Sequence, residues 1–388
     1  MFDILTLNKI SATGLSYFDK ESYAVADDFT DPDAIIVRSA SMHDMALSEN
    51  TKAIARAGAG VNNIPVDACT EKGVVVFNTP GANANAVKEL VICALLLSSR
   101  KIAAGMDWCK TLKGQGAEVG KLVEKGKGAF VGPEISGKKL GVIGLGAIGV
   151  LVANAANALG MQVYGYDPYL SVDAAWNLSR SIKHSTNIKE IFENCDYITL
   201  HIPATPDTKG MINAESIDLM PDGVRILNFA RGELVDSADL LAALGSGKVA
   251  AYATDFPSDD LIGANGVLAI PHLGASTPES EENCAQMAVI ELMGFLRDGN
   301  IKNSVNLPNV ELPRGTGTRL TLIHKNIPNM INQITSTFSA ENVNIENMVN
   351  KSKGAIAYTV IDADGDIPEH AIDAIKVIDG MVKVRVIK

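Results

Sequence analysis

The stretch Lys139-Leu-Gly-Val-Ile-Gly-Leu-Gly-Ala-Ile-Gly149 decides the fold of this 388-residue chain. Its apolar run, 140–143, is typical of a buried strand and leads directly into the pattern Gly144-x-Gly146-x-x-Gly149. A helical pattern follows over 150–159, and a second strand-like run, 161–166, ends at Asp167. Strand, glycine turn, helix and strand in this order predict a βαβ unit of a doubly wound parallel sheet.

The three glycines have separate tasks in a dinucleotide site. Gly144 permits the tight turn, Gly146 lets a pyrophosphate approach the backbone, and Gly149 lets helix and strand pack closely. The helix start that follows presents free N–H groups and the positive end of its dipole to phosphates. Asp167 stands 18 residues beyond Gly149, where its carboxylate can accept hydrogen bonds from ribose hydroxyls and would repel the extra phosphate of NADP. The pattern therefore predicts NAD as the cofactor.

Composition and charge exclude several classes of partner. With 47% apolar and 20% charged residues the chain is typical of a globular protein, and its length indicates two or three domains. A formal charge of −11 argues against nucleic acid and anionic membranes as partners, although a local basic pocket could still hold an anionic substrate. The longest apolar run, Leu90–Leu97, is too short to span a bilayer, so no membrane insertion is predicted.

The N-terminus and the cysteines indicate a reducing compartment. Residues 1–7 have a strand-like pattern without the basic lead of a secretion signal. The cysteines are scattered, odd in number and without a CxxC pair, so neither a disulfide framework nor a metal site is predicted. These cysteines are Cys69, Cys93, Cys109, Cys195 and Cys284. We expect a cytoplasmic protein without a bound metal.

The regions on either side of the glycine turn also alternate strands and helices. Residues 1–90 contain short apolar strands, clearest at 34–38 and 72–77, and predict a small α/β unit. A long helical pattern over 85–102 is followed by a glycine- and lysine-rich stretch, 113–127, which indicates an exposed arm or loop. Further strands are predicted at 196–201, 223–228 and 249–255. The fold class is therefore α/β, with two Rossmann-like, doubly wound parallel-sheet domains.

The C-terminal part of the chain has a different pattern. A proline- and glycine-rich stretch, 306–317, indicates a linker. Four strands and two helices follow in the order βαββαβ within some 70 residues, which predicts a small ferredoxin-like domain. The strands are expected at 319–324, 343–347, 355–361 and 382–387, and the helices at 328–338 and 368–378.

Three residues beyond the glycine turn are suited to hydride transfer. Arg231 ends a predicted strand, where its guanidinium could grip a substrate carboxylate and polarise a neighbouring carbonyl. His272 follows another strand-like run and can exchange a proton with an alcohol near neutral pH. Asp260 could orient this imidazole and stabilise its protonated form. Because an arginine and an acid–histidine pair together provide charge stabilisation and proton transfer, we expect these three residues to be catalytic.

Three motifs in order resemble those of the D-isomer-specific 2-hydroxyacid dehydrogenases. They are the glycine turn, Asn228-x-Ala-Arg-Gly-x-x-Val-Asp236 and Pro271-His-x-Gly-Ala-Ser-Thr277, and the resemblance covers residues 1 to about 305. It implies an NAD-dependent dehydrogenase in which Arg231, Asp260 and His272 are catalytic. The family usually has glutamate in place of Asp260, so Asp259 stays an alternative. The residues that the resemblance places on NAD are Gly144, Gly146, Ala147, Ile148, Gly149, Asp167, Phe229, Ala230, Asp255, His272, Gly274 and Ala275.

The resemblance also implies a discontinuous domain layout. A substrate-binding domain would comprise 1–90 with a returning segment, 276–303, and an NAD-binding Rossmann domain would comprise 91–275. The active-site cleft and a hinge would lie between them. A linker, 304–318, would lead to the C-terminal domain, 319–388.

Arg38 and Ser39, which end a predicted strand, indicate the substrate. In family members that oxidise 3-phosphoglycerate, an arginine and a serine at this place bind the substrate, and Arg231 would hold its carboxylate. The resemblance thus implies that 3-phosphoglycerate is oxidised to 3-phosphohydroxypyruvate in the first step of L-serine synthesis. The alternatives are another substrate (glyoxylate, hydroxypyruvate or D-lactate) and a non-catalytic, NAD-sensing scaffold.

Residues 319–388 resemble an ACT domain, a module that binds small regulatory ligands. By that resemblance His324, Asn326 and Asn344 would bind L-serine as a feedback inhibitor across an interface between domains. Asn329 departs from the glycine that many such domains have, and its side chain would crowd the pocket. A domain that only joins two copies edge to edge is the alternative, and a homodimer or a homotetramer is expected.

Overall fold

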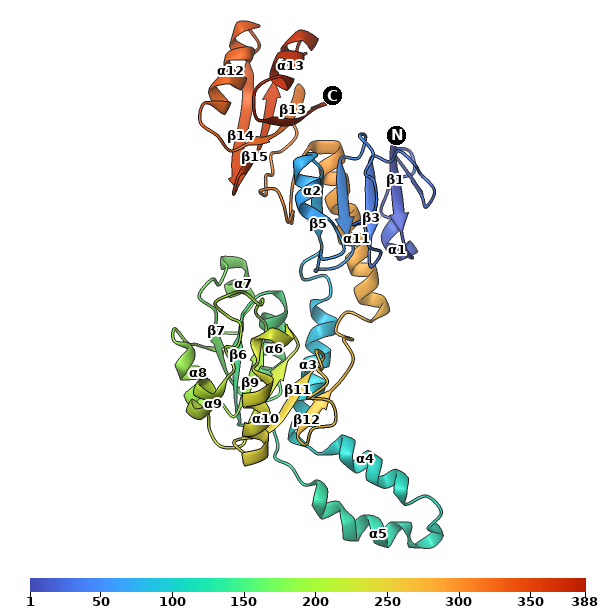
Figure 1. Cartoon of the computed structure of the whole chain (residues 1–388), viewed down its shortest axis with the longest axis vertical. Coiled ribbons are helices and arrows are strands. Elements are labelled where there is room, and N and C mark those ends of the chain that lie inside the picture. Colours follow the sequence, from blue (N-terminus) through green and yellow to red (C-terminus); the bar gives the residue numbers. More distant parts are fainter. The chain divides into compact units, whose positions relative to one another are not determined.

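The computed structural model describes all residues, 1–388, and divides into two compact units (Figure 1). The first unit consists of Met1–Ala82 and Pro278–Lys388, and the second is Asn83–Thr277. The chain crosses between the units at 82/83 and 277/278, where the sequence indicated 90/91 and 275/276. Each unit contains a parallel sheet with helices packed on it, so the α/β class is confirmed.

The first unit contains a five-stranded parallel sheet in the order β2-β1-β3-β4-β5. Runs of Ile, Val and Ala bury its central strands on both faces, as parallel sheets require. The returning helix α11 (Pro278–Asp298) places Ala288 and Leu292 in the same core as Ile36 and Phe77. The other elements are β1 (Phe2–Leu7), α1 (Ala12–Leu15), β2 (Tyr23–Ala26), β3 (Ala34–Val37), β4 (Ala53–Arg56), α2 (Val66–Glu71) and β5 (Val75–Asn78).

Part of the segment predicted as a linker, 304–318, is bound to the edge of this sheet. Ser304 pairs with Phe77 in an antiparallel bridge, and the Asn306 amide donates to the Val74 carbonyl. These polar side chains satisfy backbone groups of the edge strand that would otherwise lack partners. Composition alone indicated a linker because the pairing partners lie more than 200 residues earlier in the chain.

The C-terminal module, 318–388, has the predicted βαββαβ order and an antiparallel sheet, β14-β15-β13-β16, so the ferredoxin-like fold is confirmed. One face of the sheet carries Leu320 and Leu322 and is covered by the two helices. Ile323, Tyr358 and Val360 on the other face join the core of the first sheet. The elements are β13 (Thr318–Lys325), α12 (Met330–Ala340), β14 (Ile345–Lys353), β15 (Ile356–Ala363), α13 (Glu369–Lys376) and β16 (Met381–Ile387).

The second unit contains a seven-stranded parallel sheet in the order β12-β11-β10-β9-β6-β7-β8. Chain order reverses between β6 and β9, which is the switch point where such sheets bind ligands. Its strands are β6 (Lys139–Ile143), β7 (Gln162–Tyr166), β8 (Lys183–His184), β9 (Tyr197–Leu200), β10 (Val224–Asn228), β11 (Val249–Thr254) and β12 (Val267–Ala269). Its main helices are α3 (Ala84–Ser99), α6 (Ala147–Ala158), α7 (Val172–Asn177), α8 (Ile188–Asn194), α9 (Ala214–Leu219) and α10 (Ser237–Ser246).

A helical hairpin, α4 (Ile102–Thr111) and α5 (Val119–Gly126), extends from the sheet of the second unit (Figure 1). The stretch 113–127 is exposed as predicted, but much of it is helical. Trp108 of α4 packs against Phe130, which follows α5, with 5.3 Å between the two ring centroids. None of the helices has the length and apolar character needed to cross a membrane.

Candidate NAD and catalytic site

The glycine turn has the geometry that its sequence predicts. Gly144 has a φ of +93°, and a Cβ atom there would lie 2.5 Å from the His201 carbonyl oxygen. A Cβ at Gly149 would lie 1.9 Å from the Gly144 oxygen, so only glycine permits this close approach of helix and turn. A Cβ at Gly146 would meet nothing within 4 Å. The turn is therefore open on the side of Gly146, where helix α6 begins and a pyrophosphate would lie.

Asp167 lies beside this turn, directly after β7. Its Oδ2 accepts a hydrogen bond from the Leu145 N–H at 2.8 Å, and its Oδ1 accepts one from the Tyr169 N–H at 2.8 Å. Each carboxylate oxygen can accept a further hydrogen bond. The backbone thus fixes the carboxylate at the mouth of the glycine turn with capacity left for ribose hydroxyls.

Arg231 lies in the loop that follows β10, and the buried Asn228 holds this loop in place. The Asn228 Oδ1 accepts from the Arg231 N–H at 3.3 Å, and its Nδ2 donates to the Arg231 carbonyl at 2.8 Å. The Arg231 guanidinium is exposed, donates to the Ala230 carbonyl at 2.6 Å and has no carboxylate partner. Most of its N–H donors are therefore available to a substrate carboxylate.

Phe256 brings the two principal catalytic candidates together. Its ring centroid lies 4.6 Å from that of His272, and the Arg231 Cζ lies 5.9 Å from the same ring. The imidazole nitrogens of His272 have no hydrogen-bond partner in the protein. Sequence analysis missed Phe256, although its place immediately after the strand-end residue Asp255 was a usable signal.

The carboxyl groups in this region differ sharply in burial. Asp255 is 2% exposed, and its Oδ1 has no hydrogen-bond partner. Burial raises the pKa of Asp255, and the positive charges of His272 and Arg231 offset only part of this rise. Asp259 and Asp260 are both exposed, and neither contacts His272. The predicted pairing of Asp260 with His272 is thus not formed in this structure: the short side chain lies in the turn after Ser258.

The remaining residues predicted to bind NAD gather at one edge of the sheet. Ala147 and Ile148 form the first turn of α6, and Phe229 and Ala230 follow β10. Gly274 follows β12 and lies beside Asp255, whose Oδ2 would be 3.5 Å from a Cβ atom at this glycine. Ala275 follows directly. Because the strands are parallel, all of these residues lie at the carboxyl ends, where doubly wound sheets bind nucleotides.

In the first unit, Arg38 and Ser39 follow β3, and the Arg38 Nη2 lies 2.7 Å from Glu281 Oε1. Arg56, at the end of the neighbouring strand β4, was missed by sequence analysis. Its guanidinium lies directly over Gly58, where a Cβ would overlap it, and its Nε has no hydrogen-bond partner. Burial lowers the pKa of Arg56, and the positive charge of Arg38 lowers it further. Two adjacent strand ends thus present arginines, a pattern that suits an anion.

The three residues predicted to bind an effector do not meet within one chain. His324 is buried, and its Nε2 and the Thr359 hydroxyl are hydrogen-bonded at 2.9 Å. Asn326 donates to the Gly354 carbonyl near the same end of the sheet. Asn344 precedes Ile345, which pairs with Ala363, whereas His324 pairs with Ala357, so Asn344 lies about 20 Å further along the sheet.

The backbone conformation at position 329 explains why an asparagine can replace the usual glycine there. Its φ of +68° is left-handed, a conformation that glycine adopts without strain and asparagine tolerates better than most residues. Its side chain accepts a hydrogen bond from Asn332, and it is exposed. The backbone, rather than the effector, thus accounts for the residue type at this position.

Comparisons with known proteins agree with this geometry. Residues 92–274 match the family described as D-isomer specific 2-hydroxyacid dehydrogenase, NAD binding domain. The chain is 33% identical over 341 residues to D-3-phosphoglycerate dehydrogenase of Escherichia coli K12, covering 84% of this chain and 79% of that protein. It is 37% identical over 308 residues to D-3-phosphoglycerate dehydrogenase of Methanocaldococcus jannaschii, with 77% of this chain covered, and spans only 55% of that relative's length.

Among solved structures, the NAD+-bound 3-phosphoglycerate dehydrogenase of Entamoeba histolytica matches with a TM-score of 0.61 and 28% identity over 79% of this chain and 98% of that chain. A D-2-hydroxyisocaproate dehydrogenase matches with a TM-score of 0.63 at 21% identity over 78% of this chain and 99% of that chain, which shows a shared fold. The chain therefore belongs to the D-isomer-specific 2-hydroxyacid dehydrogenases, a family of NAD-dependent dehydrogenases, and its cofactor is NAD.

Proposed function

We propose that this protein oxidises 3-phospho-D-glycerate to 3-phosphohydroxypyruvate with NAD, the reaction that begins the phosphorylated route to L-serine. The names of the relatives from E. coli and M. jannaschii support this substrate. One observation carries the proposal: an arginine without a carboxylate partner, Arg231, and an unbonded imidazole, His272, share the Phe256 ring at the edge of an NAD-binding sheet.

The chemistry follows from these side chains. NAD, when bound, accepts the hydride that leaves C2 of the substrate. Arg231 would grip the substrate carboxylate with two N–H groups and stabilise charge on the C2 oxygen. His272 would take the hydroxyl proton as general base. Asp260, with Asp259 as the alternative, would be the acid that stabilises the protonated imidazole. Asp255 would contact NAD.

For the phosphate we propose Arg38 and Ser39, with Arg56 as a further ligand. Arg38 must first leave Glu281, but both side chains of that ion pair are more than one-third exposed, so breaking it costs little. Arg56 has an unpaired Nε and no competing carboxylate. A phosphate dianion would therefore replace one weak ion pair by contacts to two guanidinium groups.

The proposed regulation by L-serine requires a second copy of the chain. Since His324 and Asn344 lie at opposite ends of one sheet, they could share a ligand only across two C-terminal modules placed side by side. Strand β14, which Asn344 precedes, is one of the two edge strands of this sheet and could make such a pairing. The proposal therefore includes a homodimer or homotetramer, in which dimerisation without an effector is the alternative role of the module.

The decisive experiment measures NAD reduction by the purified protein with 3-phosphoglycerate, glycerate and D-lactate, each with and without L-serine. We expect activity on 3-phosphoglycerate to dominate, and activity on unphosphorylated acids alone would contradict the substrate. Arg38→Gln should raise KM for 3-phosphoglycerate and leave glycerate unaffected. His272→Ala should lower kcat by roughly 10²- to 10⁴-fold while NAD still binds. Near-normal turnover in that variant would remove His272 from the mechanism, whereas NAD binding without turnover of any acid by the unmodified protein would favour the NAD-sensing scaffold.

A further inference from the structure

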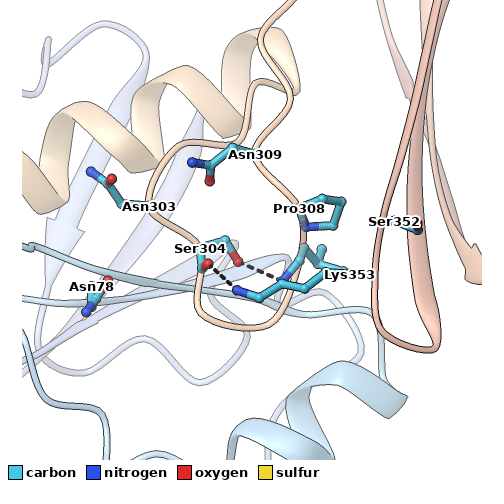
Figure 2. Close-up of a pocket in the computed structure, with 8 residues that line it drawn as sticks. Asn78, Asn303, Ser304, Pro308, Asn309, Ser352 and Lys353 are labelled. Carbon is cyan, nitrogen blue, oxygen red and sulfur yellow. Dashed lines mark hydrogen bonds between the residues drawn. The ribbon is translucent and has the colours of Figure 1, made fainter. Parts of the chain in front are cut away.

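A polar pocket of about 330 Å³ lies in the first unit, between the segment 303–309 and the β14–β15 hairpin (Figure 2). We call it the junction pocket, because it joins the edge of the first sheet to the C-terminal module. Its size falls within the range that small ligands occupy. It shares no residue with the NAD and catalytic site. The polar residues that line it are Asn78, Asn303, Ser304, Asn309, Ser352 and Lys353.

Lys353 supplies the charge of the junction pocket. Figure 2 shows its side chain reaching from the hairpin to Ser304, whose carbonyl oxygen accepts a hydrogen bond from Nζ at 3.1 Å. No carboxylate lies within ion-pair distance of this ammonium group, so two of its three donors are available. Lys353 is exposed, and its unpaired positive charge at the pocket favours an anion locally, although the chain as a whole has a net charge of −11.

The other polar groups are arranged around this charge. The side chains of Asn309 and Ser352 have no hydrogen-bond partner in the protein. Asn303 has a left-handed backbone, with a φ of +59°, and its Nδ2 donates to Glu291 Oε1 at 2.7 Å. Its Oδ1 is left as an acceptor. Besides Lys353, the pocket thus offers the Asn309 and Ser352 side chains as donors and the Asn303 amide oxygen as an acceptor.

Glu291, behind Asn303, does not cancel the charge of Lys353. Glu291 is only 6% exposed, and its Oε2 has no hydrogen-bond partner. Burial raises the pKa of Glu291 to about 8, so the carboxyl is largely protonated at neutral pH. The junction pocket therefore carries a net positive charge.

We propose that the junction pocket binds a small carboxylate that carries a hydroxyl group. The carboxylate would accept hydrogen bonds from Lys353 together with Ser352 or Asn309, and the hydroxyl would donate to the Asn303 amide oxygen. Such a ligand would contact the hairpin and the sheet edge at once. Because it would bind only when the two are docked, it would stabilise the attachment of the C-terminal module.

The test is calorimetric titration of the full-length protein, without NAD, with 3-hydroxybutyrate. This probe has the carboxylate and a hydroxyl but no 2-hydroxyl group, so it cannot be oxidised at C2. We expect saturable binding that weakens with salt, with butyrate binding more weakly and neutral glycerol not at all. Lys353→Gln should weaken binding about tenfold, the effect of losing one charged hydrogen bond. The exposed Lys351 on the same strand is the matched control, and Lys351→Gln should leave the affinity unchanged.

Several outcomes would overturn the proposal. They are no binding at tens of millimolar probe, equal affinity in Lys353→Gln and the unmodified protein, or equal weakening by both lysine variants. Asn309→Leu, which removes a second donor, should also weaken binding. Arg231→Ala should bind the probe normally, which separates the junction pocket from the active site. Since no turnover is measured, failure here leaves the proposed dehydrogenase reaction untouched, and the reverse also holds.

Discussion

Arg231 and His272 pack against the same aromatic ring, that of Phe256, with the Arg231 Cζ 5.9 Å and the His272 ring centroid 4.6 Å from its centroid. The two residues follow different strands, β10 and β12, and Phe256 follows β11, which lies between them in the sheet. A cation and an imidazole supported by one rigid ring keep a constant relation to each other. Catalysis by paired groups depends on such fixed geometry.

Replacement of Phe256 by alanine should therefore impair turnover without removing either catalytic candidate. We expect Phe256→Ala to lower kcat by roughly 10- to 100-fold, because Arg231 and His272 lose their common support. Phe256→Tyr keeps the ring and should retain most of the activity. Steady-state kinetics measures the effect, and titration of NADH fluorescence should give an unchanged dissociation constant. If alanine were as active as tyrosine at this position, the ring would have no positioning role.

Lengthening Asp260 should improve the acid–histidine pair. Asp260 is exposed and does not contact His272, and one added methylene would extend its reach. We expect Asp260→Glu to raise kcat by about three- to tenfold through stabilisation of the protonated imidazole. Asp259→Glu is the matched control and should have little effect. A gain from the Asp259 variant alone would transfer the acid role to that residue.

The buried ion pair of Arg319 and Asp362 should dominate the stability of the C-terminal module. The guanidinium donates to both carboxylate oxygens, at 2.6 and 2.7 Å, and both residues are fully buried. Arg319→Met should lower the free energy of unfolding by about 3–5 kcal/mol, because it leaves a buried carboxylate with only the distant Arg314. Adding Asp362→Asn to that variant should restore part of the loss.

Urea denaturation of these variants checks the prediction. The control is Arg297→Met, which breaks an ion pair with Asp298 whose arginine side chain is 67% exposed. That change should cost no more than about 1 kcal/mol. Equal losses from the buried and the exposed pair would contradict the account.

Glu291 should make stability depend on pH in a defined direction. Its pKa rises from an ordinary value of 4.5 to about 8 on burial, so the folded protein binds more protons than the unfolded chain between these pH values. The free energy of unfolding must then fall as the pH rises from about 4.5 to about 8. Glu291→Gln removes the titration and keeps the acceptor for Asn303. The melting temperature of this variant should exceed that of the unmodified protein by roughly a few degrees at pH 8.5.

The comparison is made by scanning calorimetry at pH 5.5 and pH 8.5. The difference in melting temperature should be smaller at the lower pH, where the unmodified carboxyl is protonated in the folded state. Glu279→Gln, an exposed position on the same helix α11, should show no such growth with pH. A pH-independent difference for Glu291→Gln would mean that packing, and not proton binding, separates the two proteins.

The amino-acid sequence by itself determined the architecture. The run 139–167 predicted the turn, the helix and the strands of the NAD-binding sheet, and the alternation after residue 318 predicted the βαββαβ module. These features are readable because strand periodicity, helix periodicity and glycine turns depend on neighbours within a few residues. The same local patterns marked Gly144, Arg231 and His272, since each follows a predicted strand.

Only the tertiary structure decided how separate segments meet. Phe256 became a shared support because parallel strands bring three loops to one edge. The same cause places Arg56 beside Arg38. Asn306 satisfies an edge strand some 230 residues earlier, and the register of β13 and β15 separates His324 from Asn344. Such contacts depend on strand order and register, which are set by packing of the whole sheet and leave no trace in a short stretch of sequence.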